Sequence, residues 1–230
     1  KTQLYHHSTR TPLMVRVPGI TKEGKVDKLH MVSVLDLLPT ILDTLKIDKP
    51  DRLDGRSFYP VLKGEKQDNR DFVIKQYHEN SGRSRDPMRA IETKTHLYIF
   101  NPWSNGERIF ATATNGTETY KRMIALAEED EEMNKRLEIY RYRVPQELYQ
   151  VKRNPDCTEN LINYPNQEKV KNKLQKLLEE WMITTGDPII ECFQNRHDAE
   201  FIEAYVQKLE AESEARRKAS PAKPKKKKKS

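Results

Sequence analysis

The spacing of hydrophobic positions along this chain changes several times between the short period of strands and the longer period of helices. The first apolar run is residues 13–17 (LMVRV), which Pro18 and Gly19 close. A short apolar run that contains β-branched residues and is bounded by Pro and Gly is typical of a buried strand. We therefore expect a buried strand at residues 13–17.

Residues 31–47 have the longer period. Their apolar positions recur every three or four residues, at Leu38, Ile41, Leu42 and Leu45. Asp36 is a good helix cap, and Pro39 then lies in the first turn, where its missing N–H costs little. The pattern predicts a helix whose apolar face packs in a core. The next segment, residues 52–64, contains an Asp-Gly turn signal and is expected to be a loop.

Four later segments have the composition and period of strands. They are residues 71–78 (DFVIKQYH), 88–93 (MRAIET), 95–100 (THLYIF) and 147–151 (ELYQV). The second and third follow each other closely, so they predict a hairpin. Strands joined over such short distances predict a small antiparallel sheet.

The remaining sequence predicts helices. Residues 104–146 are mostly polar, and we expect a helix in them at 128–142. A second helix is expected at residues 166–186, where Gly186 closes it. Its apolar stripe is Val170, Leu174, Leu177, Leu178, Trp181 and Met182. A last helix is expected at residues 198–218.

The net charge of +7 comes from the C-terminal end of the chain. Residues 216–230 contain nine Lys or Arg residues and no acid, so the remaining chain has a net charge of −2. A nucleic-acid-binding domain gathers cations on a folded face, so no nucleic-acid partner is expected for the folded body. No run approaches the roughly 20 apolar residues that span a bilayer, and no signal segment is visible.

Self-contained catalytic motifs are absent from the sequence. It has no Gly-rich phosphate loop, no G-x-S-x-G elbow and no H-E-x-x-H. The two cysteines, Cys157 and Cys192, can pair or stay free. The remaining candidates are the two histidines at residues 6–7 and His78. Adjacent histidines on an extended segment point to opposite sides, so at most one of the first pair would face a cleft.

The strongest signal is a series of short motifs in one order. They read K-T-Q-L-Y-x-x-x-x-R-x-P-L, V-x-x-P-G, V-S-V-L-D-L-L-P-T-I-L-D and D-G-R-S-F, all within residues 1–58. The series resembles the C-terminal half of sulfatases of the alkaline-phosphatase-like superfamily. Where that family typically has Glu-Gly-Gly, this sequence has His6, His7 and Ser8. These positions line the approach to the sulfate site in the family, so they bear on substrate preference.

The second half of the sequence narrows the resemblance. H-E-N-S-G-R-S-R-D-P-M-R-A-I-E-T-K-T-H-L-Y-I-F-N at residues 78–101 and E-L-Y-Q-V-K-R-N-P-D-C-T-E-N-L at 147–161 are similar to the C-terminal domain of heparan N-sulfatases, the N-sulfoglucosamine sulfohydrolases. The resemblance covers residues 1 to about 193. It leaves out the last helix and the basic tail.

Together with the patterns described above, the resemblance predicts a fold class and four segments. Residues 1–66 are expected to be the end of an α/β catalytic domain, with exposed apolar faces. Residues 67–193 are expected to be an α+β C-terminal subdomain, in which a helix packs on a small antiparallel sheet. Residues 194–218 are expected to form a C-terminal helix, and residues 219–230 a disordered Lys-rich tail.

The resemblance also implies roles for particular residues. Lys1 is expected to contact the sulfate, because an ammonium suits a compact anion with many oxygens. His78 and His6 are expected on the substrate side. Arg89 either binds the anionic sugar or pairs with an acid in the sheet. Calcium and a formylglycine nucleophile are expected in the intact enzyme, with the metal ligands and the nucleophile outside this sequence, because neither cysteine is followed by the family's Pro and Arg.

The leading hypothesis is a sulfatase fragment, inactive by itself, whose parent hydrolyses sulfate esters or sulfamates on a sulfated sugar such as N-sulfoglucosamine. The expected partner is a sulfated saccharide, and the expected location is secreted, periplasmic or lysosome-like. Two alternatives stay open. The basic tail can make the chain a polyanion-binding module, or the parent can be a phosphatase or phosphonate hydrolase of the same superfamily.

Overall fold

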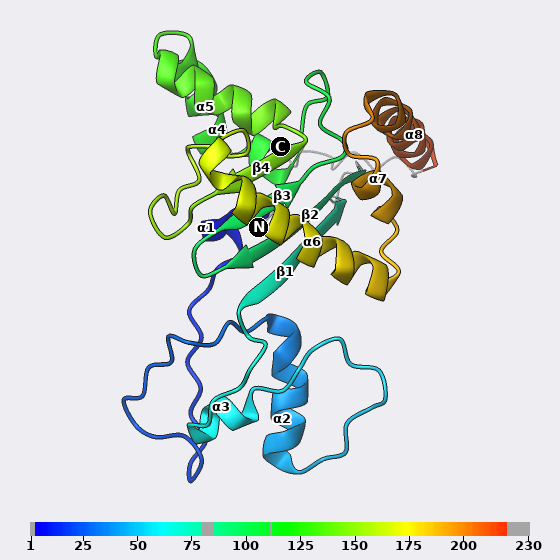
Figure 1. Cartoon of the computed structure of the whole chain (residues 1–230). Coiled ribbons are helices and arrows are strands. Elements are labelled where there is room, and N and C mark those ends of the chain that lie inside the picture. The colour runs from blue at the N-terminus through cyan, green and yellow to red at the C-terminus, as the bar shows by residue number, and fades with distance from the viewer. Residues whose placement is uncertain (1–2, 80–84, 111, 220–230) are drawn as a thin grey trace, which may run out of the picture.

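A computed structural model of the chain describes residues 3–79, 85–110 and 112–219. Its centre is a four-stranded antiparallel sheet with the strand order β1-β2-β3-β4 (Figure 1). The strands are β1 (Phe72–Glu79), β2 (Arg85–Thr93), β3 (Leu97–Phe100) and β4 (Gln146–Tyr149). The prediction of a small antiparallel sheet built from these segments is confirmed.

The longest helices follow the sheet in the sequence. Helix α6 (Glu168–Thr185) crosses one face of the sheet (Figure 1) and ends at Gly186, whose φ of 63° suits glycine. The other helices of this part are α4 (Glu118–Ala127), α5 (Glu131–Tyr142), α7 (Ile190–Gln194) and α8 (Ala199–Lys218). The predicted helices α5, α6 and α8 are confirmed, whereas α4 and α7 were not predicted. None of the described helices is long and apolar enough to cross a membrane.

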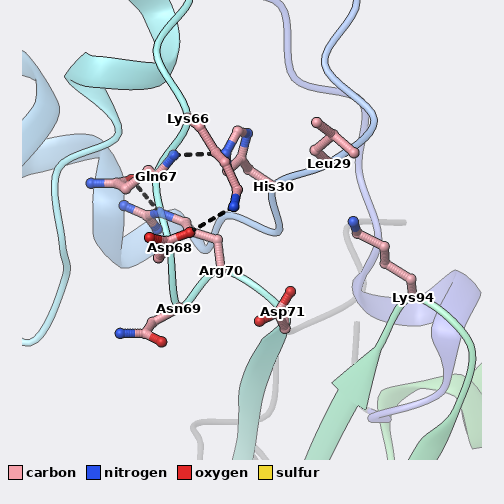
Figure 2. Close-up of a pocket in the computed structure, with 9 residues that line it drawn as sticks. All are labelled: Leu29, His30, Lys66, Gln67, Asp68, Asn69, Arg70, Asp71 and Lys94. Carbon is pink, nitrogen blue, oxygen red and sulfur yellow. Dashed lines mark hydrogen bonds and ion pairs between the residues drawn. The ribbon is translucent and has the colours of Figure 1, made fainter.

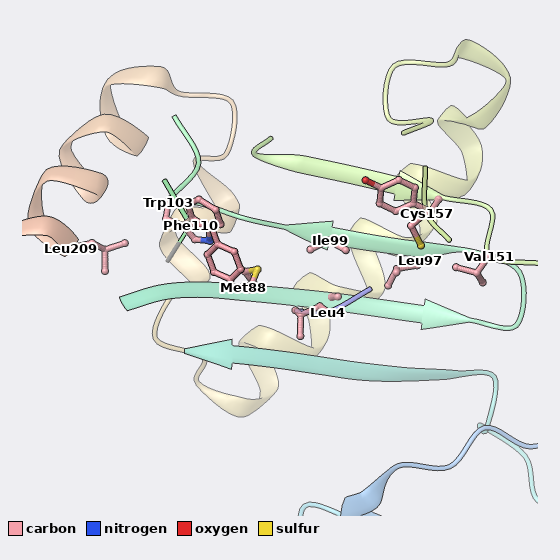
Figure 3. Packing of buried hydrophobic residues seen from close by; sticks show 11 residues of the cluster. Leu4, Met88, Leu97, Ile99, Trp103, Phe110, Val151, Cys157 and Leu209 are labelled. Atoms are coloured by element: carbon pink, nitrogen blue, oxygen red, sulfur yellow. The ribbon is translucent and has the colours of Figure 1, made fainter. Parts of the chain in front are cut away.

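Alternation along the strands divides the core into two clusters. On the α6 side, apolar residues of β2, β3 and β4 pack against Leu174, Leu178 and Met182. The opposite face packs against Trp103, Phe110 and Leu209 (Figure 3). The Trp103 and Phe110 rings stack with their centres 5.0 Å apart. Full burial of one such side chain stabilises the fold by about 1.5–3 kcal/mol, so these two clusters are the main apolar contribution to stability.

The N-terminal part of the chain is built differently. It contains the short helices α1 (His6–Thr9), α2 (Leu37–Leu45) and α3 (Tyr59–Lys63), and long connections without strands. Short 3₁₀ turns also occur, at Val34–Asp36, Ala113–Gly116 and Pro165–Gln167. Helix α3 lies inside the segment that was expected to be a loop. The four segment boundaries stay predictions, and the expected disordered tail lies outside the described residues from position 220 onward.

The expected buried strand at residues 13–17 does not form. Leu13 and Met14 are 47% and 94% exposed, and the segment pairs with no strand in the described part of the chain. An apolar run is buried only where another surface covers it, and no described segment does so here. The prediction of a buried strand was therefore wrong for this chain.

Helix α2 forms as predicted, but its apolar face does not lie in a core. Leu38 and Ile41 are 51% and 52% exposed. They belong to a larger set that we call the N-terminal apolar surface: Leu13, Met14, Val15, Val26, Leu29, Val34, Leu35, Leu38, Ile41, Leu45 and Ile47. The expectation of core packing for α2 was wrong, whereas the expected exposed apolar faces are present.

Asp36 holds together residues 31–66, which we call the α2 region. Its buried carboxylate accepts the backbone N–H groups of Ser33 at 2.9 Å and Arg56 at 2.7 Å. The same carboxylate pairs with Nη1 of Arg70 at 2.6 Å. Asp36 is the N-cap residue of α2, as predicted, but its side chain makes no cap hydrogen bond there. It is instead the third residue of the capping box of the preceding 3₁₀ turn, whose cap is Ser33.

Gly55 explains why the motifs V-S-V-L-D and D-G-R-S-F occur together. A Cβ at Gly55 would lie 2.0 Å from the carbonyl oxygen of Leu35. Only glycine lets the two backbones approach this closely. Both motifs are thus parts of one structural unit around Asp36.

Candidate functional site

Three of the four residues that the resemblance singles out lie in the described part of the chain, and Lys1 lies outside it. His6 begins helix α1, so the two adjacent histidines do not lie on the extended segment that was expected. The whole residue His6 is only 9% exposed, whereas the His7 side chain is 59% exposed. Only His6 of this pair is held inside the fold.

His6 is held by a buried carboxylate on β2. Its Nδ1 lies 2.8 Å from Oε1 of Glu92, and the ammonium of Lys75 binds Oε2 of the same group. Lys75 also donates to the carbonyl oxygen of Leu4 at 3.3 Å. Burial lowers the pKa of Lys75, and the charge of Glu92 opposes that shift. Because a buried carboxylate requires partners, Glu92 ties the N-terminal segment to β1 and β2.

A second buried carboxylate, Glu147 on β4, holds Tyr5. The Tyr5 hydroxyl donates to Oε2 of Glu147 at 3.0 Å, and Arg143 pairs with Oε1 at 2.9 Å. The Arg143 guanidinium also lies 4.3 Å from the centre of the Tyr5 ring. Burial, together with the charge of Glu147, raises the pKa of Tyr5, so its hydroxyl remains a donor. Residues 3–6 are therefore fixed on one face of the sheet.

His78 lies at an irregularity near the end of β1. The register with β2 shifts there, so Asp86 and Pro87 stand opposite the single His78. Such bulges redirect side chains and are frequent beside active sites, and they tolerate proline. The side chain of His78 is exposed. Desolvation and then the charge of Arg89 lower the pKa of His78, while Asp187 opposes this. A neutral imidazole can both donate and accept a hydrogen bond.

Arg89 is fully buried and pairs with an acid. Its Nε and Nη2 donate to the two carboxylate oxygens of Asp187 at 2.6 and 3.2 Å. The side chains are 0% and 1% exposed. Of the two roles that the sequence left open for Arg89, this geometry matches the ion pair, but the acid follows helix α6 and does not lie in the sheet as expected.

The three residues do not form one cluster. Glu92, which binds His6, and Arg89 lie three positions apart on β2, so they point to opposite faces of the sheet. Arg89 and His78 are neighbours on the α6 side. Leu4, next to the His6 segment, packs in the cluster on the other face.

Sequence reasoning missed the acidic partners of these residues. Glu92 follows the apolar pair Ala90 and Ile91 in β2, and Glu147 precedes Leu148 and Tyr149 in β4, and charged residues are rarely buried without a partner. That contrast was an available signal for a buried pair, although it does not identify the partner. Asp187 gave no comparable signal, because it stands between Gly186 and Pro188, in the kind of turn sequence where Asp is frequent.

A pocket of about 200 Å³ lies between the α2 region and the sheet (Figure 2). Its lining residues are Leu29, His30, Lys66, Gln67, Asp68, Asn69, Arg70, Asp71 and Lys94. Both ring nitrogens of His30 are engaged, Nδ1 with Asp27 at 2.9 Å and Nε2 with the N–H of Gln67 at 3.0 Å. The guanidinium of Arg70 pairs with the carboxylate of Asp36. The main polar groups of this pocket thus serve the local structure.

The cysteines do not resemble a nucleophile. Cys157 and Cys192 are free and buried, and burial raises the pKa of each thiol to about 11. Such a thiol is a poor nucleophile at neutral pH. Within residues 3–79, 85–110 and 112–219, no three His, Cys, Asp or Glu side chains gather where they could hold a metal ion. The described residues therefore do not fit the calcium and formylglycine that the resemblance implies.

Comparison with known proteins identifies the relatives of the chain. A family model described as N-sulphoglucosamine sulphohydrolase, C-terminal, matches residues 1–107. The human N-sulphoglucosamine sulphohydrolase is 29% identical over 205 residues, which cover 82% of this chain and 39% of the human protein. The chain is related to the C-terminal part of sulfatases. A delta 4,5-hexuronate-2-O-sulfatase of Bacteroides thetaiotaomicron is 32% identical over 108 residues, 46% of this chain and 22% of that protein.

This sulfatase-related chain spans well under half the length of these relatives. A solved structure described as a 2-O GAG sulfatase matches with a TM-score of 0.50 and 24% identity, covering 74% of this chain and 29% of that one. At that identity the likeness shows the fold alone, and it agrees with the predicted α+β architecture. The matched residues 1–107 contain His6, His78 and Arg89.

Proposed function

We propose that this chain is part of a sulfatase whose intact form hydrolyses sulfate esters or sulfamates on a sulfated sugar such as N-sulfoglucosamine. The observation that carries the proposal is the similarity to human N-sulphoglucosamine sulphohydrolase over 82% of the chain. The relative from Bacteroides thetaiotaomicron is named as an O-sulfatase, so the choice of an N-sulfated sugar rests on the human relative. The secreted, periplasmic or lysosome-like location stays a prediction.

In this proposal, residues 1–66 complete a larger catalytic domain. The support is the N-terminal apolar surface, whose eleven large apolar side chains are all exposed. The preceding part of the same polypeptide would cover it. Residues 67–193 would then form the smaller subdomain beside the catalytic cleft.

The proposed roles of the site residues follow from their chemistry. Lys1 contacts the sulfate as a point charge, which stabilises the sulfate oxygens as the S–O or S–N bond breaks. His78 contacts the sugar, where a neutral imidazole hydrogen-bonds to hydroxyl groups. His6 orients the segment that leads back to Lys1, because its ring is bound to Glu92.

Calcium and formylglycine belong to the proposed intact enzyme. Their ligands and precursor would come from outside these residues, because the described part of the chain contains no cluster that could hold a metal. The contribution of this chain is binding and charge stabilisation.

The test compares turnover by the 230-residue chain with turnover by the full-length protein. We expect the chain alone to hydrolyse neither N-sulfoglucosamine nor an aryl sulfate, and the full-length protein to hydrolyse the sugar. In the full-length protein, Lys1→Ala should lower kcat by roughly 10²–10³-fold, as when one stabilising donor is lost. Turnover by the purified chain, or an unchanged kcat in Lys1→Ala, would contradict the proposal.

His78→Ala tests the sugar contact in the same full-length protein. It should mainly raise KM for the sulfated sugar, because a contact to the substrate away from the reacting bond is lost. An aryl sulfate has no sugar, so its turnover is the internal control and should stay the same. Equal losses on both substrates would show that His78 acts elsewhere.

The second candidate function is polyanion binding by the basic tail. The observation that favours it is the concentration of nine cations in residues 216–230 on a body of net charge −2. Binding to immobilised heparin by the chain, lost when residues 219–230 are deleted, would support this role. Retention of binding after that deletion, which leaves three of the nine cations at residues 216–218, would place the polyanion contact on residues 1–218.

A further inference from the structure

The side chain of Arg89 is bonded to the backbone that carries His78. Its Nη1 donates to the carbonyl oxygen of Tyr77 at 3.2 Å, which belongs to the peptide group that directly precedes His78. The same nitrogen donates to the carbonyl oxygen of Met88 at 2.9 Å. The other two donor nitrogens, Nε and Nη2, bind Asp187. Each guanidinium nitrogen therefore has a partner, and the group links β1 to β2 beside the bulge.

The place of Asp187 is set by the end of helix α6. Its N–H donates to the carbonyl oxygen of Met182 at 2.9 Å, within the turn that Gly186 makes. Its Oδ1 also accepts the N–H of Ile189 at 3.0 Å. The carboxylate is thus held in place by bonds that do not involve Arg89. Through the pair, the last turn of α6 is connected to the bulged end of β1.

We infer that Arg89 and Asp187 are positioning residues for His78: they fix the backbone at the bulge and set the balance of charge that the imidazole faces. Neither residue is assigned a contact with substrate. The role of His78 toward a sugar rests on the proposed function, whereas its positioning by this pair does not.

Four charged groups act on the pKa of His78 through their charge. They are Arg89 and Arg85 on β2, Glu79 on β1 and Asp187 after α6. Glu79 and Arg85 are in turn paired with helix α8, through Arg216 and Glu212. Arg89 and Arg85 lower the pKa of His78, and Asp187 and Glu79 raise it. Arg89 and Asp187 therefore have opposite effects, although they form one bonded unit.

This opposition gives a direct test on the 230-residue chain. The pKa of His78 would be measured by NMR titration of the histidine ring protons, with His78→Gln used to assign the signal. Arg89→Gln leaves the Asp187 charge alone and should raise the pKa of His78. Asp187→Asn leaves the Arg89 charge alone and should lower it. If the pair had only a structural role, both substitutions would shift the pKa of His78 in the same direction, toward the value of an unperturbed histidine. This result would overturn the inference.

A second variant keeps the test valid if a single substitution unfolds the chain. Removing one partner of a buried pair is strongly destabilising, whereas replacing both by apolar residues of similar volume is tolerated. The double variant Arg89→Met/Asp187→Leu should fold, and its His78 signal should be displaced from the wild-type position. An unchanged His78 signal and titration in the folded double variant would overturn the inference. Arg70→Gln, which removes a different buried Arg–Asp pair, is the matched control and should leave the His78 titration unchanged.

Activity of the full-length protein separates this inference from the proposed function. If the NMR shifts appear and Asp187→Asn changes KM for the sulfated sugar but not for an aryl sulfate, both stand. If the NMR shifts appear and KM stays the same on both substrates, the sugar role of His78 fails and the positioning role stands. If the NMR shifts are absent, the positioning role fails whatever the kinetics show.

Discussion

Helices α2 and α6 have the same kind of amphipathic pattern but opposite surroundings. Leu178 of α6 is fully buried against the sheet, whereas Leu38 of α2 is 51% exposed. The difference does not come from the helices themselves, because both have leucines at helical spacing. It comes from what lies opposite: α6 faces a sheet in the same chain, and no described segment covers the apolar side chains Leu38 and Ile41 of α2. An amphipathic helix therefore indicates that a partner surface exists, not that the surface belongs to the same chain.

The two regions are consequently stabilised by different interactions. The sheet and α6 are held by apolar packing, with Leu174, Leu178 and Met182 in the core. The α2 region is held by the buried Asp36–Arg70 pair and the backbone groups around it. The predictions that follow test whether this division is real, since each one changes one region and examines the other.

The largest expected effect is that of Asp36→Asn. The substitution leaves the buried guanidinium of Arg70 without its anion, which typically costs about 3–5 kcal/mol. Hydrogen exchange should increase in peptides from residues 31–66, while peptides from β2 and β3 keep their protection. Asp43→Asn is the control on the same helix, because Asp43 pairs with Lys49 at the surface and its loss should have little effect.

An equal loss of protection in the sheet would contradict the division into two regions. It would mean that the α2 region and the sheet unfold as one cooperative unit.

The second prediction compares two leucines directly. Leu178→Ala should lower the free energy of unfolding by about 2–5 kcal/mol, because it leaves a cavity in the core. Leu38→Ala should change it by about 0.5 kcal/mol or less, because the side chain already lies in water. Urea unfolding of both variants, followed by circular dichroism, measures the difference. Similar losses would show that the N-terminal apolar surface is covered in solution.

The sheet could be predicted from the sequence because its signals are local. The alternation in MRAIET and THLYIF and the turn between them define β2 and β3, and Gly186 marks the end of α6. The strand at residues 13–17 could not be judged in this way, since its burial depends on a surface that the described residues do not supply. Helix α4 was missed although Tyr120, Met123 and Ile124 recur at helical spacing in it, because it lies in a stretch that was interpreted only as mostly polar.

The candidate site was predictable only in part. His78 and Arg89 were found through the family resemblance, and the alternative of an ion pair for Arg89 matches the geometry. The partner Asp187 lies 98 positions away from Arg89 in the sequence, and no local pattern joins them. The same holds for His6 and Glu92, which are 86 positions apart. Pairings of this kind are produced by the register of the sheet and the end of α6, so they become visible only in three dimensions.

The smallest expected effect separates two adjacent histidines. His6→Ala removes one partner of the buried Glu92, although Lys75 still binds that carboxylate. A buried group that loses one hydrogen bond costs about 1–3 kcal/mol, so His6→Ala should destabilise the chain by that amount. His7→Ala should have almost no effect on stability, because His7 and Asp156 form an exposed pair at 3.4 Å.

Urea unfolding measures both changes, and hydrogen exchange of residues 3–10 shows whether the N-terminal segment leaves the sheet. His6→Gln keeps a donor for Glu92 and should recover part of the loss. If His6→Ala and His7→Ala behave alike, Glu92 does not hold this segment, and the proposed orientation of Lys1 loses its support.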